Sequence, residues 1–250
     1  MKKDFVQKYK RIIGILNFNE GVLTRTRNFT PDYIYTDSFI DYTSFDEMVV
    51  LDVTKSISKS DRRLFLNKTS EIASECNIPM TIGGNINSII DVHDLFNIGA
   101  DRVLVNYQKL LNLDLTKEIS DIYGSQSLIA SVDHTDSSSL TSDELSNLKI
   151  SIKFLDSLGV GEYLLNSKTL DGTLKGPDLN FASIISKCTK TPIVICGGIG
   201  NWNHMSEAFS LEFLAGVGTS NILHLTSNSI HSAKIFLSQQ GLKIRLPWNP

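Results

Sequence analysis

A short sequence pattern occurs twice in this chain, and its repetition limits the folds that the chain can adopt. Residues 192–199 read PIVICGGI and residues 79–86 read PMTIGGNI, so the two segments align without a gap at an offset of 113 residues, from Pro79 to Pro192. Each is an apolar run of strand length that stops at glycines and is followed by helix-forming sequence. Because the offset is close to half of the 250 residues, we interpret the chain as a duplicated half-protein.

Apolar runs of strand length recur along the whole chain, with helical patterns between them. Most runs are continuous rather than alternating, which is typical of parallel strands buried on both faces. Strand followed by helix, repeated eight times, favours a closed parallel barrel over an open sheet. The sequence therefore predicts one α/β domain over residues 1–250, a single (β/α)8 TIM barrel with an internal half-barrel duplication. The expected strands are residues 11–17, 48–52, 79–82, 102–106, 127–133, 162–166, 192–196 and 213–217, and the expected helices include 62–76, 89–98, 142–158 and 181–188.

Composition and charge argue against several functional classes. The formal net charge is −3 without a basic run, so nothing indicates a nucleic-acid or anionic-membrane surface. No apolar stretch approaches the roughly 20 residues of a membrane span, and the charged N-terminus does not resemble a signal peptide. We therefore expect a cytoplasmic protein. Cys76, Cys188 and Cys196 lack metal-ligand spacing and are interpreted as reduced core thiols, and the five histidines show no metal spacing either. We expect no metal and no cofactor.

In a (β/α)8 barrel, the chemistry lies at the C-terminal ends of the strands. The residues that end the expected strands are mostly polar or glycine, and bare glycine backbone between a strand and a helix suits phosphate binding. Residues 167–176 form a polar loop whose Asp-Gly-Thr could close over a substrate phosphate. The candidate substrate- or phosphate-binding residues are Asp52, Gly84, Asn85, Asn106, Asp171, Gly172, Thr173, Gly197, Gly198, Thr219 and Ser220. Asp52 could equally be a loop cap.

Taken in order, these segments resemble the HisF family, the cyclase subunit of imidazole glycerol phosphate synthase, over nearly the whole chain. The resemblance implies a barrel that forms a heterodimer with a HisH-like glutaminase, conducts its ammonia along the barrel axis and uses it at the top face with a phosphorylated ligand. The matching segments are RIIGILNFNEG, EMVVLDVTKS, IPMTIGGNI, GADRVLVN, YGSQSLIASVD, GVGEYLLNSKTLDGTLKGPDL and TPIVICGGIGN.

The same resemblance extends to the N-terminal ends of the strands. Charged residues there match the family's ring that gates the ammonia entrance, and Asp101 matches an aspartate that contacts the partner. An ordinary ion-pair network at the base of the barrel is the alternative interpretation. The ring residues are Arg11, Glu47, Arg102 and Glu162.

The reaction centre departs from the family pattern. The family uses one aspartate at the end of the first strand and one at the end of the fifth as an acid–base pair. Asp133 keeps the fifth-strand position, but Asn17 stands at the first, and an amide cannot transfer a proton at neutral pH. Asn85 replaces the third glycine of one phosphate loop. The chain also leaves little room for a first barrel helix in residues 36–45 and lacks the family's hairpin after Asp133.

Three functions remain open at this point. HisF-like proteins of a glycosyl-amidation branch (WbuZ-like), found with surface-polysaccharide genes, also lack the first-strand aspartate and carry a segment that resembles residues 24–33. This likeness implies delivery of ammonia to an ATP-dependent enzyme that amidates a nucleotide-linked sugar. The alternatives are a cyclase of histidine biosynthesis with Asp133 as base, and a non-catalytic scaffold that activates the glutaminase. Arg25, expected in a loop, matches a family lysine and is a candidate phosphate contact; His134 should face away from Asp133 because strand neighbours alternate.

Overall fold

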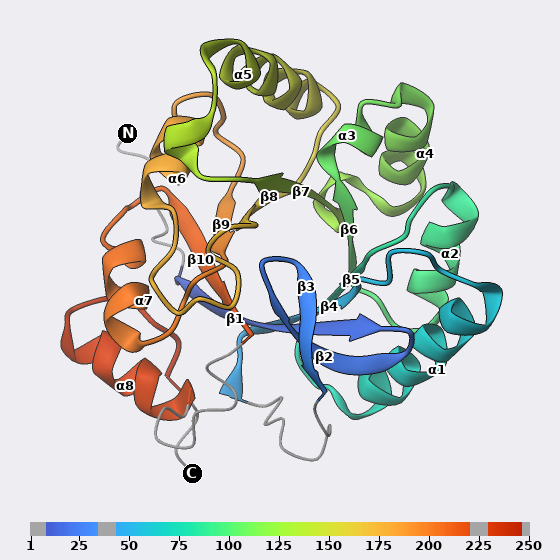
Figure 1. The fold of residues 1–250 in the computed structure, drawn as a ribbon, viewed down its shortest axis with the longest axis horizontal. Coiled ribbons are helices and arrows are strands. Elements are labelled where there is room, and N and C mark those ends of the chain that lie inside the picture. Colours follow the sequence, from blue (N-terminus) through green and yellow to red (C-terminus); the bar gives the residue numbers. More distant parts are fainter. Residues whose placement is uncertain (1–8, 35–43, 221–229, 247–250) are drawn as a thin grey trace, which may run out of the picture.

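The computed structural model describes residues 9–34, 44–220 and 230–246. Eight parallel strands form a closed barrel because β10 (Leu214–Thr219) pairs with β1 (Arg11–Asn19) (Figure 1). The (β/α)8 barrel predicted from the sequence is therefore confirmed. Between these two strands the barrel order is β4 (Glu47–Asp52), β5 (Met80–Gly83), β6 (Arg102–Asn106), β7 (Leu128–His134), β8 (Glu162–Ser167) and β9 (Ile193–Cys196).

Alternate side chains of each strand face the barrel axis, and the side chains between them face the helices. The outward set belongs to a large buried cluster shared with the helices. Burial on both faces explains why the strands appear in the sequence as continuous apolar runs. The axial set forms a separate buried cluster of Ile13, Ile15, Val49, Leu104, Ile129, Leu164, Val194 and Cys196.

Helices surround the barrel and begin where the sequence offers capping residues. Ser58 and Asp61 form a capping box, so the first helix begins at Lys59, three residues before the expected 62. Thr141 and Glu144 form another at the expected start of α5. The helices are α1 (Lys59–Glu75), α2 (Ile89–Asn97), α3 (Tyr107–Leu110), α4 (Leu113–Tyr123), α5 (Ser142–Ser157), α6 (Leu179–Ser186), α7 (Trp202–Phe209) and α8 (Ile230–Gln239).

A β-hairpin follows the first barrel strand and was not predicted. β2 (Val22–Arg27) pairs antiparallel with the end of β1 and with β3 (Thr30–Ile34), and Figure 1 shows the hairpin across the barrel opening. The turn residues Asn28 and Phe29 have φ of 51° and 60°, as two-residue hairpin turns require. The expectation that Arg25 lies in a loop is wrong, because Arg25 lies in β2.

The duplicated sequence pattern corresponds to two similar strand–loop junctions. β5 and β9 are four strands apart in the barrel, and the residues that follow them, Gly84 and Gly197, have φ of 93° and 87°. A Cβ at Gly84 would lie 2.1 Å from the Asp52 carbonyl oxygen, and one at Gly197 would lie 2.9 Å from that of Ser167. Asp52 and Ser167 end the strands before β5 and β9, so each half brings its glycine against the same neighbouring position.

Two connections of the barrel bear on the sequence predictions. Residues 36–43, most of the segment with little room for a first barrel helix, lie outside the described residues. The connection after β7 carries a 3-10 turn, Ser137–Ser139, before α5 begins. Across the described ranges, no helix combines the length and the apolar character needed to cross a membrane.

Candidate functional site

A cavity of about 340 Å³ lies at the C-terminal ends of the barrel strands. Its floor is apolar and includes Ile15, Leu51 and Cys196, whereas its rim is polar. Of the residues that the sequence suggested for this end, Asn85, Thr173 and Arg25 do not line the cavity. Those that line it are Asn17, Asp52, Gly84, Asn106, Asp133, Asp171, Gly172, Gly197, Gly198, Thr219 and Ser220.

Asp133 lies at the end of β7 and is held by two side chains. Its Oδ1 accepts a hydrogen bond from the Ser131 hydroxyl at 2.9 Å, and its Oδ2 accepts one from the Asn106 amide at 3.2 Å. Burial raises the pKa of Asp133, against the lowering effects of Ser131, Lys168 and Asn106. A buried carboxyl group with a raised pKa, held by two hydrogen bonds, is of the kind that serves as a general acid or base. The sequence analysis missed Ser131, although its place two residues before Asp133 puts both on one strand face.

Asn17 lies at the end of β1 and is 6% exposed. Its amide Nδ2 donates to the Thr26 hydroxyl at 3.1 Å. Position 17 therefore offers hydrogen bonds but no titrating proton. Thr26 also lines the cavity, and the sequence analysis missed it because its position depends on the hairpin.

Asp171 joins the β8–α6 connection to the tip of the hairpin. Its Oδ2 accepts the Phe29 N–H at 3.0 Å, and its carbonyl oxygen accepts the Asn28 N–H at 3.0 Å. Next to it, a Cβ at Gly172 would lie 2.4 Å from the Thr26 carbonyl oxygen. Burial raises the pKa of Asp171, while hydrogen bonds from Phe29 and Thr26 oppose that rise. The hairpin and the β8–α6 connection thus meet at the cavity.

The two glycine loops are held differently. Gly176 N–H donates to the Gly198 carbonyl oxygen at 2.8 Å, and a Cβ at Gly198 would lie 2.1 Å from the Gly176 carbonyl oxygen. In the other half, the Asn85 amide donates to the Thr54 carbonyl oxygen at 3.0 Å. Asn85 also has a positive φ of 53°, which asparagine tolerates better than most residues. Its side chain therefore bonds to the β4–α1 connection.

Asp52 both caps a loop and borders the cavity. Its Oδ1 accepts the Thr54 N–H at 3.1 Å, and its Oδ2 lies 3.8 Å from Arg62 Nη1 on α1. The same Arg62 nitrogen donates to the Gly84 carbonyl oxygen at 3.4 Å. Arg62 therefore connects α1 to the end of β4 and to one glycine loop. No sequence signal marked it.

Cys196 is the one cysteine at the cavity, and all three cysteines are free thiols. Burial raises its pKa strongly, and the carboxylates of Asp133 and Asp171 raise it further. The thiol is therefore protonated and a poor nucleophile. Within the described ranges, no group of three His, Cys, Asp or Glu side chains is arranged to hold a metal ion.

At the opposite end of the barrel, four charged side chains form a closed ring. Arg11 Nη1 lies 2.8 Å from Glu47 Oε2, and Arg102 Nη1 lies 2.6 Å from Glu162 Oε2. Arg11 also pairs with Glu162, and Arg102 with Glu47, so every charge has two opposite neighbours. The glutamates are 3% and 6% exposed, against 26% and 18% for the arginines, so the guanidinium groups lie nearer the solvent. Asp101 lies outside the ring, where its carboxylate accepts the Met80 N–H.

A void of about 10 Å³ adjoins the two ring glutamates on the barrel axis. This is room for about one water-sized molecule. Leu104 and Leu164 line both this void and the larger cavity. They therefore belong to the apolar layer that separates the ring from the mouth.

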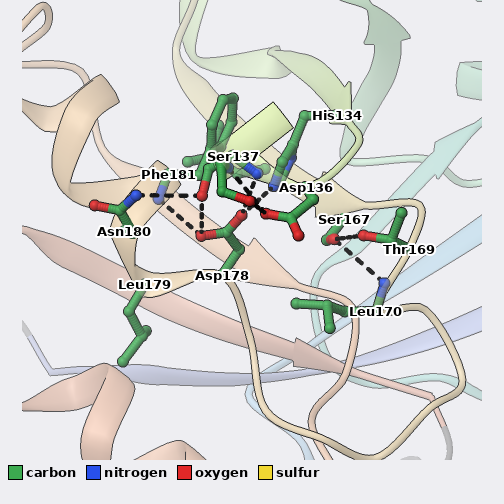
Figure 2. A network of polar contacts seen from close by, with 12 residues as sticks. His134, Asp136, Ser137, Ser167, Thr169, Leu170, Asp178, Leu179, Asn180 and Phe181 are labelled. Atoms are coloured by element: carbon green, nitrogen blue, oxygen red, sulfur yellow. Dashed lines mark hydrogen bonds and ion pairs between the residues drawn. The ribbon is translucent and has the colours of Figure 1, made fainter. Parts of the chain in front are cut away.

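His134 faces the helices rather than the cavity, as expected. Its ring stacks on Phe181 at 3.6 Å between centroids, and its Nε2 lies 3.3 Å from Asp178 Oδ2 (Figure 2). Ser137 donates to the same carboxylate through its N–H and its hydroxyl. Burial alone would raise the pKa of Asp178, but the contacts from His134, Phe181 and Ser137 outweigh it and lower the pKa to about 2. This network attaches the connection after β7 to the start of α6.

Comparisons with known proteins agree with this architecture. The sequence model of the histidine biosynthesis protein family matches residues 17–228. Imidazole glycerol phosphate synthase subunit HisF of Chloroherpeton thalassium is 32% identical over 252 residues, covering 95% of this chain and 99% of the relative. The HisF subunits of Chlorobaculum tepidum and Bacillus pumilus are 31% and 30% identical, covering 95% and 94% of this chain and 99% of each relative. The chain therefore belongs to the histidine biosynthesis protein family, as a divergent member of its HisF group.

Proposed function

We propose that this chain is the ammonia-receiving subunit of a glutamine amidotransferase. It forms a heterodimer with a HisH-like glutaminase, takes ammonia through the charged ring, and delivers it to the mouth cavity. The observation that carries this proposal is the ring of Arg11, Glu47, Arg102 and Glu162 around the same axis as the polar cavity. Buried ion pairs add little net stability, so four charges around a barrel axis favour a gate over a purely structural network.

The ring and the layer above it suit neutral ammonia. The two guanidinium groups lie on the solvent side and repel ammonium, whereas ammonia is about the size of the water molecule that the small void can hold. Passage requires the ring to open and the layer of Leu104 and Leu164 to move. Asp101, at the same end, is the proposed contact with the glutaminase.

At the mouth, the chain binds a phosphorylated ligand through backbone at the glycine loops. Gly197 and Gly198 face the cavity together with Thr219 and Ser220, and glycine-rich junctions before a helix are suited to anions. The other glycine loop contributes Gly84. Occupancy of this site would signal to the glutaminase that the acceptor is in place.

The fate of the ammonia follows from Asn17. The first-strand aspartate of the family's acid–base pair is replaced by Asn17, so we favour delivery to an ATP-dependent enzyme that amidates a nucleotide-linked sugar of a surface polysaccharide. The second candidate is the cyclase reaction of histidine biosynthesis, because the relatives are named as subunits of imidazole glycerol phosphate synthase and Asp133 keeps its hydrogen-bond partners. In that case Asp133 acts as the base.

The two candidates differ in a direct assay. The purified chain is given the substrate of imidazole glycerol phosphate synthase with an ammonium salt, and in parallel is mixed with a HisH-like glutaminase. No turnover, together with stimulated glutamine hydrolysis, supports the amidation role. Turnover that disappears in Asp133→Asn but persists in Asp136→Asn, an exposed control on the outer loop, contradicts it.

A variant at the first strand refines this assay. If only the acid is missing, Asn17→Asp should restore cyclisation, and Asp133→Asn in the same background should abolish it. A scaffold without ammonia transfer is the remaining alternative. This alternative is excluded if an amidated product contains labelled nitrogen from glutamine that unlabelled ammonium in the solution has not diluted.

A further inference from the structure

Lys168 lies on the axial side of the barrel mouth, directly beyond the end of β8. Along β8, Glu162, Leu164 and Asn166 all line axial cavities. The Lys168 N–H donates to the His134 carbonyl oxygen at 2.8 Å, so the β7–β8 ladder continues one step past the strand. Because strand side chains alternate between faces, Lys168 shares the axial face of Asn166.

Two contacts define what Lys168 faces. Its Nζ lies 5.9 Å from the ring centroid of Phe29, and that ring lines the cavity. Asp133 on β7 is the register partner of Asn166, so Asp133 and Lys168 lie on adjacent strands at the same rim. Lys168 itself is exposed, and its ammonium forms no ion pair with the carboxylates that the structure describes. Its positive charge therefore acts on the mouth.

Among the ionisable groups around Asp133, Lys168 is the cation that follows the neighbouring strand. The cavity is also lined by Asp52, Lys55, Asp171 and Cys196. Of these, Lys55 carries a positive charge, but it follows β4, three strands from β7 in the barrel, whereas Lys168 follows the adjacent strand β8. His134 lies on the opposite face of the strand, against Asp178. Burial raises the pKa of Asp133, and Lys168 is the largest charged contribution that lowers it.

We propose that Lys168 is a positioning residue that keeps Asp133 ionised in a mouth where Asn17 stands at the first strand. Asp133 can then accept the proton that the nitrogen of ammonia releases after its lone pair has bonded to an acceptor atom. The use of Asp133 as a base rests on the second candidate under the proposed function, the cyclase reaction. The charge state of Asp133 can nevertheless be measured without ammonia, glutaminase or substrate. A failure of this inference is thus distinguishable from a failure of the proposed function.

The test is a carbon-13 NMR titration of the aspartate carboxyl groups in the full chain, with Asp133 assigned by its absence in Asp133→Asn. Lys168→Met should raise the pKa of Asp133 by about one unit, the usual scale for losing a nearby opposite charge. Lys168→Arg keeps the charge and should leave the pKa within about 0.3 units of wild type. Lys175→Met, an exposed lysine in the same connection, should leave it unchanged.

Each outcome decides the inference. An Asp133 pKa that does not move in Lys168→Met, or moves equally in Lys168→Arg, overturns it, because the effect would then be absent or steric. If Lys168→Met does not fold, the wild type still gives a result: raising sodium chloride from low to molar concentration screens an exposed ammonium and should raise the pKa of Asp133. An unchanged value there also overturns the inference.

Discussion

Lys234→Met tests whether a buried ion pair holds the strands that carry the ring. Lys234 Nζ on α8 lies 2.7 Å from Asp46 Oδ1, and Asp46 Oδ2 accepts the Ile12 N–H at 2.8 Å. The lysine and aspartate side chains are only 4% and 6% exposed. Because Asp46 precedes Glu47 and Ile12 follows Arg11, this contact fixes the backbone beside two ring residues.

The magnitude follows from what the substitution leaves behind. Methionine fills much of the lysine volume but removes the cation, so the Asp46 carboxylate stays buried without its Lys234 partner and keeps the Ile12 N–H. Removing one partner of a buried pair costs about 3–5 kcal/mol of unfolding free energy. At about 2–4 °C per kcal/mol for a chain of this size, the melting temperature should fall by about 6–20 °C. Asp46→Asn in the Lys234→Met background removes the uncompensated charge, so the double variant should regain at least half of the loss.

The assay is urea unfolding followed by circular dichroism. Lys68→Met is the matched control, because the Lys68–Glu71 pair is 47% and 63% exposed and should change the unfolding free energy by less than about 1 kcal/mol. A loss below about 1 kcal/mol for Lys234→Met would refute the reasoning. So would a double variant less stable than the single one.

Three further predictions concern the mouth, the ring and the outer network. Gly198→Ala should weaken the binding of inorganic phosphate, measured by calorimetry, about tenfold or more. It should also lower the unfolding free energy more than Gly241→Ala does. The reason is that a Cβ at Gly198 would lie 2.1 Å from the Gly176 carbonyl oxygen, whereas one at Gly241 would have nothing within 4 Å. Equal effects would contradict this. Arg102→Met opens the ring, so less glutamine-derived nitrogen should reach the product while glutamate formation continues. Parallel assays measure the glutamine-derived nitrogen in the product and the glutamate formed. An unchanged ratio of product nitrogen to glutamate counts against a gate. The pKa of Asp178 is lowered to about 2, so its carboxylate stabilises the fold fully above about pH 4, and this stabilisation is lost toward pH 2. The difference in unfolding free energy between wild type and Asp178→Asn should therefore shrink from about pH 4 to about pH 2. Urea unfolding at each pH measures it.

The barrel could be predicted because its strands are buried on both faces. β6 has the predicted bounds, Arg102–Asn106, and the other strands are displaced by a residue or two at their ends. The hairpin of β2 and β3 could not be found in the same way. Its strands are short, half exposed and rich in threonine and arginine, so they lack the apolar signal on which the other strands were recognised.

The candidate site was predictable where it depends on strand ends, and not where it depends on side-chain contacts. Position alone selected Asn17, Asp133 and the glycine loops, because parallel strands end at one rim. Arg62 reaches the rim from a helix, and Thr26 reaches it from the hairpin. Such contacts depend on how elements pack in space, which spacing along the sequence does not reveal.

The most direct test of the account is the path of nitrogen through the assembled protein. The chain and a HisH-like glutaminase are added to an extract of cells that lack this gene, with glutamine labelled with nitrogen-15 at its amide and a tenfold excess of unlabelled ammonium. Mass spectrometry then measures the label in the amidated product. If ammonia passes through the barrel, the product keeps most of the glutamine label in the wild type and loses it in Arg102→Met. Passage through the barrel would be contradicted if the product made with the wild-type chain had the same fraction of nitrogen-15 as the bulk ammonium.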